Sequence, residues 1–497
     1  MIQKIVVLGA GSAGLLAAIS LKRKIPRLDV QVVRSPSIGV IGVGESTTPN
    51  FPYHLFEYLG ISRKRFYELA EPTWKLGIKF LWGSRGRFDY TFQHQLDTHH
   101  PGLAKPTGFY CREDFNNVSL PGALMHQEMA FPRQPNGAPD IHAWHAFHIE
   151  NKKFVRILEI VAREQGVSFI DGKVTAAERS ADGIAAIRLD GGERVAADFF
   201  VDASGFRSEL LGKALEEPFV SFASSLFCDR AVIGGWNRTD EKIQPYTTAE
   251  TMNSGWAWQI DHEKIINRGY VYCSQSISDE EAAAEFYRKN PRITDEPQFI
   301  KFRSGCYKRQ WVGNVVALGN SGGFVEPLES TALMILCSNI RSMIDLLIHC
   351  DMNPNPSARD LFNDLTYASW QDIRGFLSIH YKFNGLLDTP FWKQVRAEAD
   401  VLHVEPLLDF YHENGPTGFC RYRMPHTQSD FGLEGYLVML VGNQVPYNNR
   451  YDVPAEEMEW WKRRKAAFVQ QASLGIRSEE ALAYVKHPGW TWNADRA

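Results

Sequence analysis

Hydrophobic positions at the start of the chain follow two different periods. Residues 5–8 are a continuous apolar run, typical of a buried strand, whereas the apolar residues of 15–21 recur at the spacing of a helix. Glycines separate the two stretches, and a second apolar run at 30–33 follows the helix. This order predicts a βαβ unit of the Rossmann type at the N-terminus.

The rest of the chain continues with strands and helices and then becomes helical. Residues 152–166 have the apolar period of an amphipathic helix, and short strands are expected at 185–189 and 197–202. Residues 314–320 predict a strand that is apolar on both faces and therefore central in a covered sheet. From about residue 330 the pattern is helical. We expect an α/β sheet with inserted elements, followed by a mostly helical C-terminal region.

Composition and charge are those of an ordinary globular enzyme. The 497 residues include 44% hydrophobic and 23% charged side chains, which excludes a disordered, collagen-like or rod-shaped chain. Because 54 Lys and Arg face 58 Asp and Glu, we expect no nucleic-acid partner. The seven scattered cysteines indicate reduced thiols. No signal peptide is evident and no apolar run approaches the roughly eighteen residues of a membrane span, so we expect a cytoplasmic protein without membrane association.

Three glycine-containing turns follow predicted strands. The turn at 9–14 has the spacing that lets a backbone approach a pyrophosphate, and the turns at 202–205 and 319–323 end later strands with small residues. Each could be an ordinary turn, but three separated ones favour the extended cofactor FAD over NAD. The candidate cofactor-binding residues of these turns are Gly9, Gly11, Ser12, Ala13, Gly14, Asp202, Gly319 and Gly322.

Arg34 stands at the end of the second predicted strand, where a nucleotide-binding unit usually carries an acidic residue. An arginine there fits the 2′-phosphate of NADP, the adenosine part of FAD, or a solvated strand end. This residue alone does not choose the cofactor.

Residues 73–82 alternate apolar and polar positions, which predicts a single strand with Lys75 and Lys79 on one face. Lysines in such a pattern usually face water, but an amine in a dry pocket can act as a nucleophile. Trp256 and Trp258 likewise share one face of a predicted strand, which is typical of core packing.

Residues 324–331 place two carboxylates around a proline just before an apolar helix. We expect the side chain of Ser330 or Thr331 to cap this helix, whose free N–H groups could then hold a small anion.

These motifs, in this order and spacing, resemble the flavin-dependent halogenases of the tryptophan halogenase family. The resemblance implies an FAD-binding, flavin monooxygenase-like fold, with residues 1–395 as the core and residues 396–497 as a mainly helical region that covers the substrate site. It also implies that Gly44, Glu45 and Ser46 of the IGVGEST segment contact FAD. The segments that carry the resemblance are GAGSAG at 9, IGVGEST at 41, WKLGIKF at 74, HAWH at 142, VDASG at 201, MNSGWAWQI at 252, IKFRSG at 300, GFVEPLEST at 323 and DTPFW at 388.

In that family reduced FAD (FADH2) and O2 convert a halide into hypohalous acid, which moves through a tunnel to a lysine and then halogenates an aromatic ring. By motif match the lysine is Lys75, and the carboxylate that assists it is Glu329. Physically, Lys75 could polarise the acid as an ammonium or carry the halogen as an amine, and Glu329 could accept the ring proton.

The resemblance also places the halide and the tunnel. Chloride or bromide would lie on the backbone N–H groups of Thr331 and Ala332, and the family commonly has glycine where Ala332 stands. Trp256, Trp258 and Ser330 would line the wall between flavin and substrate, while Glu326 and Pro327 would shape the turn.

The substrate side departs from the tryptophan-specific members. Residues 423–443 lack the Tyr-Tyr and glutamate cluster that holds the amino acid's charged groups, so an indole, another aromatic without the zwitterion, or a larger or carrier-bound aromatic is expected. FADH2 would come from a separate NAD(P)H-dependent flavin reductase, and a homodimer is common in the family. A flavin-dependent aromatic monooxygenase and a non-catalytic FAD protein are the alternatives. The histidines at 94, 99, 100, 142 and 145 lack nearby ligands, so no metal site is expected.

Overall fold

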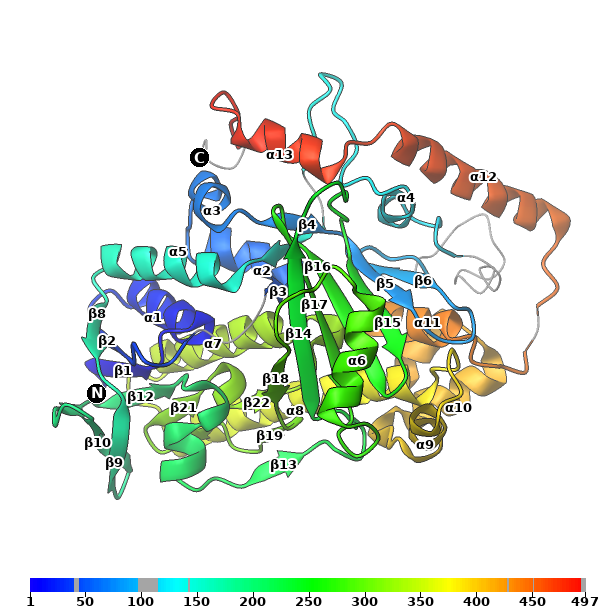
Figure 1. The fold of residues 1–497 in the computed structure, drawn as a ribbon. Coiled ribbons are helices and arrows are strands. Elements are labelled where there is room, and N and C mark those ends of the chain that lie inside the picture. The colour runs from blue at the N-terminus through cyan, green and yellow to red at the C-terminus, as the bar shows by residue number, and fades with distance from the viewer. Residues whose placement is uncertain (40–43, 97–114, 142–143, 427–428, 450, 493–497) are drawn as a thin grey trace.

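The computed structural model describes residues 1–39, 44–96, 115–141, 144–426, 429–449 and 451–492. A six-stranded, mostly parallel sheet contains the first two strands of the chain together with later ones (Figure 1). The predicted βαβ unit is present as β1 (Lys4–Leu8), α1 (Ser12–Lys24) and β2 (Asp29–Arg34). In order across the sheet, the strands are β20 (Trp311–Val312), β21 (Val315–Ala317), β12 (Phe199–Asp202), β1, β2 and β8 (Ser168–Asp171).

Alternating side chains of β1 bury both faces of this sheet. Ile5 and Val7 pack with α1, α5 (Asn151–Glu164) and α7 (Ala332–His349), whereas Val6 and Leu8 pack with a small antiparallel sheet on the opposite face. Figure 1 shows α1 and α5 above the six-stranded sheet and the small sheet below it. This small sheet consists of β11 (Arg194–Ala196), β10 (Gly183–Leu189) and β9 (Val174–Ser180).

A seven-stranded sheet is inserted between the strands of the first one, as the fold class predicts. It brings β5 (Gly77–Leu81) into parallel pairing with β15 (Thr247–Met252), although some 170 residues separate them in the sequence. The remaining strands are β18 (Gln298–Lys301), β14 (Arg230–Asn237), β17 (Ile265–Tyr272), β16 (Gly255–Asp261) and β6 (Phe88–Thr91), and α6 (Asp279–Lys289) contacts β14 and β17.

Two further small sheets connect the large ones. One consists of β3 (Glu45–Ser46), β7 (Ala146–Ile149) and β4 (Thr73–Lys75), and the other of β13 (Phe219–Ser221), β19 (Gly305–Tyr307) and β22 (Gly323–Phe324). The single strand predicted over 73–82 is therefore wrong. It breaks at Leu76, whose backbone N–H donates to the carbonyl of Pro245, so that β4 and β5 belong to different sheets.

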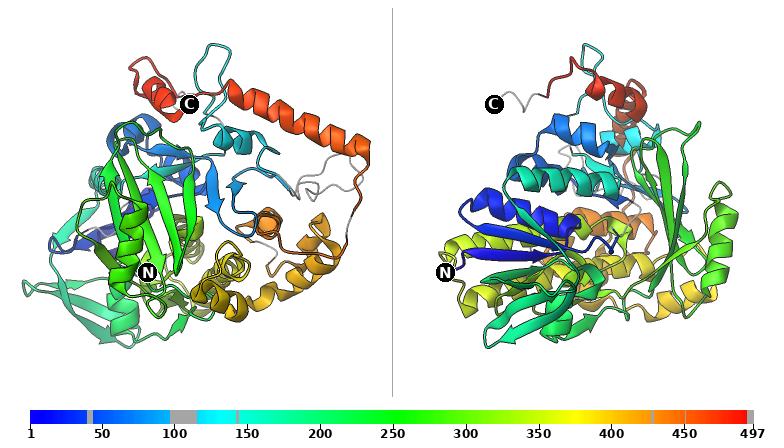
Figure 2. Two further views of the ribbon diagram at one scale, coloured as in Figure 1. Left: turned by 45° about the vertical axis from the view of Figure 1, so that its right-hand side comes forward. Right: turned by 60° about the vertical axis from the view of Figure 1, so that its left-hand side comes forward.

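Helices form most of the described chain from α7 onward, and shorter ones lie earlier. Figure 2 shows α12 (Ala455–Ser473) as a long outer helix that leads to α13 (Ser478–Lys486). The other helices are α2 (Asn50–Tyr53), α3 (Arg63–Ala70), α4 (Leu120–His126), α8 (Pro356–Lys382), α9 (Pro390–Glu398), α10 (Glu405–Asn414) and α11 (Gly432–Gly442). The division of the chain at residue 395 stays a prediction.

The expectation that no apolar stretch approaches the length of a membrane span is wrong for α7. Among the described residues this helix alone is long and apolar enough to cross a membrane, with a mean hydropathy of 1.4. More than half of it is buried inside the protein, where Leu336, Ile340 and Ile344 contribute to the main core. Its apolar character thus matches a core helix.

Candidate active site

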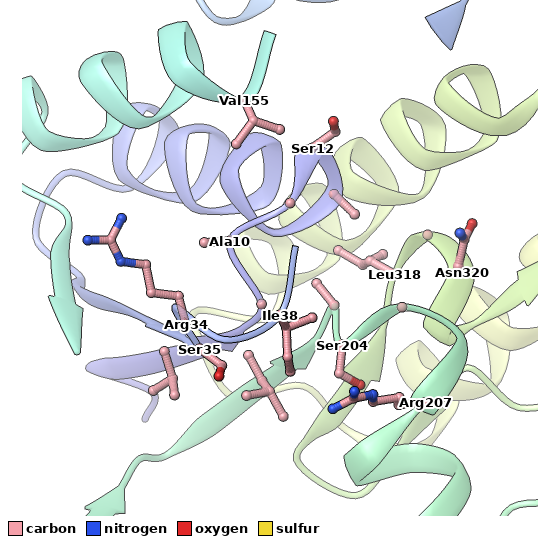
Figure 3. A pocket seen from close by; sticks show the side chains of 18 of the residues that line it. Ala10, Ser12, Arg34, Ser35, Ile38, Val155, Ser204, Arg207, Leu318 and Asn320 are labelled. Atoms are coloured by element: carbon pink, nitrogen blue, oxygen red, sulfur yellow. The ribbon is translucent and has the colours of Figure 1, made fainter. Parts of the chain in front are cut away.

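A cavity of about 590 Å³ lies at the carboxyl ends of β1, β2 and β12 (Figure 3). Its lining includes the turn after β1, the start of α1, residues 203–205 after β12 and the start of α7. A cavity outside the carboxyl ends of parallel strands is where this class of sheet binds its ligands. The three predicted glycine-containing turns thus converge on one cavity.

Two glycines of the turn after β1 lie where no side chain would fit. A Cβ atom on Gly9, which has φ of +117°, would lie 2.3 Å from the carbonyl oxygen of Ala203, and one on Gly14 would lie 1.9 Å from that of Gly9. Gly11 has no atom within 4 Å of its Cβ position and lines the cavity. Because no side chain caps the N-terminus of α1, its free N–H groups can bind a pyrophosphate there. The cavity therefore fits a dinucleotide such as FAD.

The predicted cofactor residues divide into two groups. Those that line the cavity are Gly9, Gly11, Ser12, Ala13, Arg34, Glu45 and Gly319, and those outside its lining are Gly14, Gly44, Ser46, Asp202 and Gly322. The carboxylate of Asp202 instead accepts hydrogen bonds from the backbone N–H groups of Leu210 and Leu211 at 2.8 and 3.0 Å. Residues 40–43 of the IGVGEST segment lie outside the described residues.

Arg34 lies at one end of the cavity and is held by two carboxylates (Figure 3). Its guanidinium lies 2.7 Å from Asp171 and 2.8 Å from Glu159, and the hydrogen bond to Asp171 is the main cause that raises its pKa. The side chain is thus an ordered part of the wall, where it can contact the adenosine end of a dinucleotide.

Lys75, the last residue of β4, is completely buried. Its Nζ donates hydrogen bonds to the carbonyl oxygen of Thr47 at 3.1 Å and to Oγ of Ser330 at 2.8 Å. Burial lowers the pKa of Lys75 from 10.5 to about 7, against the opposing influence of Glu329. A water-facing lysine was one expectation for this position, and the burial contradicts it.

Glu329 lies in a short helical turn, Pro327–Glu329, and its carboxylate is buried against His380 of α8. Nδ1 of His380 lies 2.9 Å from the carbonyl oxygen of Phe376, which can only accept, so Nδ1 carries a hydrogen. Nε2 lies 2.7 Å from Oε1 of Glu329. The imidazole of His380 is thus held between the carbonyl oxygen of Phe376 and the carboxylate of Glu329.

The start of α7 contacts both Lys75 and the cofactor cavity. Ser330 contacts Lys75, and Ala332, two residues later, lines the cavity. Ser330 has a left-handed backbone, with φ of +59°, and Thr331 precedes the helix without a side-chain capping bond. The predicted side-chain cap is therefore wrong, and the N–H groups at this helix end are not occupied by a side chain of its N-cap residue.

Trp256 and Trp258 are buried side by side on β16, with ring centroids 6.2 Å apart. Nε1 of Trp256 donates to Oε2 of Glu326 at 2.6 Å, and the hydroxyl of Tyr381 donates to the same oxygen. Burial raises the pKa of Glu326 to about 7. Glu326, which the sequence assigned only to the shape of the turn, thus anchors the tryptophan.

Histidine does not build a metal site in the part of the chain that is described, where no group of three or more potential ligands occurs. Three of the histidines considered from the sequence, at positions 99, 100 and 142, lie outside the described residues.

Comparison with known proteins assigns this geometry to one family. The model of the family described as tryptophan halogenase matches residues 4–453. The tryptophan 7-halogenase RebH of Lentzea aerocolonigenes is 32% identical over 439 residues, which cover 82% of each chain. The structure of MibH, a lanthipeptide tryptophan 5-halogenase, is 40% identical, with a TM-score of 0.89 over 98% of this chain and 94% of its own. BrvH, a flavin-dependent halogenase from Brevundimonas sp. BAL3, is 26% identical, with a TM-score of 0.86 over 98% and 100%.

Proposed function

The chain belongs to the tryptophan halogenase family, and from this premise we propose that it halogenates an indole-type ring through hypohalous acid relayed to Lys75. It is a flavin-dependent halogenase, and this family implies FAD and a halide as reactants. The single observation that supports the assignment best is a completely buried lysine that is hydrogen-bonded to Ser330, which lies in sequence between the buried Glu329 and Ala332 of the cofactor cavity.

The residues that would hold FAD are those of the cavity wall. The N–H groups at the start of α1 would bind the pyrophosphate, and Arg34 would lie at the adenosine end. When bound in its reduced form, the cofactor supplies the two electrons that O2 needs to oxidise the halide. The N–H groups of Thr331 and Ala332 at the start of α7 would hold the halide, because a helix N-terminus without a side-chain cap favours an anion.

Lys75 would accept the halogen as an amine. A neutral amine has two hydrogens and one lone pair, and the two acceptors recorded for Nζ match the two hydrogens. With a pKa of about 7, a large share of Lys75 is uncharged at neutral pH. Its lone pair can then attack the halogen of hypohalous acid.

Glu329 would accept the proton that the aromatic ring loses when its carbon bonds to the halogen. The carboxylate lies near enough to Lys75 to oppose the lowering of its pKa, and its contact with His380 fixes the position of one oxygen. General-base assistance of this kind is worth about 10²- to 10⁴-fold in rate.

An indole within a larger molecule fits the substrate side better than free tryptophan. Glu434 of α11, in the stretch where tryptophan-specific members hold the amino acid, is buried and accepts hydrogen bonds from the backbone N–H groups of Gln95 and Leu96 at 2.7 and 3.0 Å. It is therefore engaged with the chain itself rather than free for a substrate ammonium group. The 40% identity to a structure described as a lanthipeptide tryptophan halogenase favours a tryptophan side chain within a peptide.

A separate NAD(P)H-dependent flavin reductase would deliver FADH2, as flavin-dependent halogenases generally require. The preference between chloride and bromide, the homodimer and the cytoplasmic location stay predictions.

The test is mass spectrometry of products formed from indole, tryptophan and tryptophan-containing peptides. The protein is incubated with FAD, a flavin reductase, NADH and either chloride or bromide, with catalase present to remove free peroxide. We expect a halogen isotope pattern on a peptide or indole, lost in Lys75→Ala while FAD stays bound, and retained in Lys79→Ala on the neighbouring strand. Product at the wild-type rate in Lys75→Ala would contradict the role of this lysine, and a product heavier by one oxygen would identify a monooxygenase.

A further inference from the structure

A chain of hydrogen-bonded side chains runs from Lys75 to a buried histidine that the proposed reaction does not use. Nζ of Lys75 donates to Oγ of Ser330 at 2.8 Å, and Ser330 donates to Oγ of Ser46 at 3.0 Å. Oγ of Ser46 lies 2.8 Å from Oγ1 of Thr247, which lies 2.8 Å from Nε2 of His148. The three hydroxyls connect β3, β15 and the start of α7, with His148 on β7.

His148 is completely buried and uncharged. Burial is the main cause that lowers its pKa well below 6.5, and the nearby charge of Lys75 acts in the same direction. Nε2 of His148 lies 2.8 Å from Oγ1 of Thr247, and an uncharged imidazole nitrogen without a hydrogen can accept the hydrogen of this hydroxyl.

The direction of every hydroxyl follows from the Lys75 end of the chain, where Nζ donates to Ser330 and Ser330 donates to Ser46. Each hydroxyl has one hydrogen and, in this chain, one neighbour on either side, so all of them must point the same way. Thr247 donates to His148, Ser46 to Thr247 and Ser330 to Ser46. Oγ of Ser330 can then only accept from Lys75.

We propose that His148 and Thr247 are positioning residues that keep the lone pair of the Lys75 amine free. This inference rests on the proposed function of Lys75. If the chain ran in the opposite direction, Ser330 would donate its hydrogen to the lone pair and block the amine. With the inferred direction, Thr47 and Ser330 accept the two amine hydrogens, and neither of them donates to the lone pair.

The chemical step balances with this arrangement. The nitrogen lone pair forms the N–halogen bond as the halogen–oxygen bond of hypohalous acid breaks, and the departing oxygen leaves as water with one amine proton. In the next step the halogen bonds to the ring carbon, and the nitrogen keeps the electron pair of the broken N–halogen bond. Glu329 accepts the proton that the ring loses and passes it to the nitrogen, which restores the amine.

Steady-state halogenation by Thr247→Val tests the proposal, because this change removes the hydroxyl but keeps the shape of the side chain. We expect kcat to fall about tenfold, as for the loss of one hydrogen bond to a reacting group, with the KM of the aromatic and the Kd of FAD unchanged. Thr247→Ser keeps the hydroxyl and should recover most of the rate. Thr248→Val, on the other face of β15, is the matched control with wild-type turnover.

Three outcomes would count against the proposal. A wild-type kcat in Thr247→Val, or equal losses in Thr247→Val and Thr247→Ser, would overturn it while leaving the role of Lys75 intact. Absence of product from the wild-type protein would overturn the proposed function and this inference with it. If Thr247→Val does not fold, Ser46→Ala breaks the same chain one link earlier and should give the same loss of kcat.

Discussion

Replacing Lys75 by methionine should stabilise the protein, because it removes a buried amine and keeps an unbranched side chain. The pKa of Lys75 falls from 10.5 in water to about 7 in the fold. At about 1.4 kcal/mol per pKa unit, the folded state loses about 5 kcal/mol near pH 7 relative to a solvated lysine. Leaving the oxygens of Thr47 and Ser330 without their donor costs about 2 kcal/mol. The free energy of unfolding of Lys75→Met should therefore exceed that of the wild type by about 3 kcal/mol.

The difference should shrink as the pH rises. The unfolded chain keeps the proton of Lys75 up to about pH 10.5, whereas the folded chain releases it near pH 7. Between these values the unfolded state binds more protons, so raising the pH stabilises the wild type and not the variant. At pH 9 the burial of Lys75 still costs the wild type about 2 kcal/mol, and the hydrogen bonds that Lys75→Met loses cost the variant about as much. The two proteins should then be about equally stable.

Urea unfolding followed by circular dichroism at pH 7 and pH 9 measures both quantities. Lys64→Met is the control, because Lys64 is exposed on α3, and its effect should be the same at both pH values. A Lys75→Met variant that is less stable than the wild type by the same amount at both pH values would refute the reasoning. It would show that the folded protein keeps Lys75 as a paired ammonium group.

The remaining predictions concern proton transfer and cofactor binding. Glu329→Gln should lower the halogenation rate about 100-fold while flavin oxidation continues, as measured by product formed per NADH consumed. His380→Phe should lower the halogenation rate about tenfold, and His380→Gln, whose amide can still donate to Glu329, should lower it less. Equal losses of rate in the two variants would exclude a role for the hydrogen bond between residue 380 and Glu329. Gly14→Ala should abolish FAD binding in a fluorescence titration, because its Cβ would meet the carbonyl oxygen of Gly9 at 1.9 Å. Gly11→Ala should fold normally and bind FAD more weakly, since its Cβ meets no protein atom but enters the cavity; wild-type affinity would contradict the assigned cradle.

Local sequence patterns were sufficient for the Rossmann-type unit. The turn after β1 needs Gly9 and Gly14 for reasons that lie within a few residues or in the adjacent strand end, so spacing alone reveals it. The break of the strand at Leu76 could not be predicted, because the acceptor of its N–H group is the carbonyl of Pro245, far along the chain. Alternating polarity looks the same for one strand or for two strands in different sheets.

The proposed catalytic residues Lys75 and Glu329 came from a motif, whereas their partners had no local signal. His380 lies 51 residues after Glu329 in a long helix, where a histidine is usually a packed core residue. His148 and Thr247 likewise meet only through the pairing of separate sheets. Hydrogen-bond partners of this kind depend on tertiary contacts, which a single sequence does not contain.

The wall of the cofactor cavity and the C-terminal helices come from separate parts of the chain. Within the described part of the chain, every residue of its wall lies between Leu8 and Leu336, so the helices from α9 onward contribute nothing to it. Substitutions in those helices should therefore leave the wall of this cavity unchanged, so variants of α9 through α13 should keep the wild-type affinity for FAD.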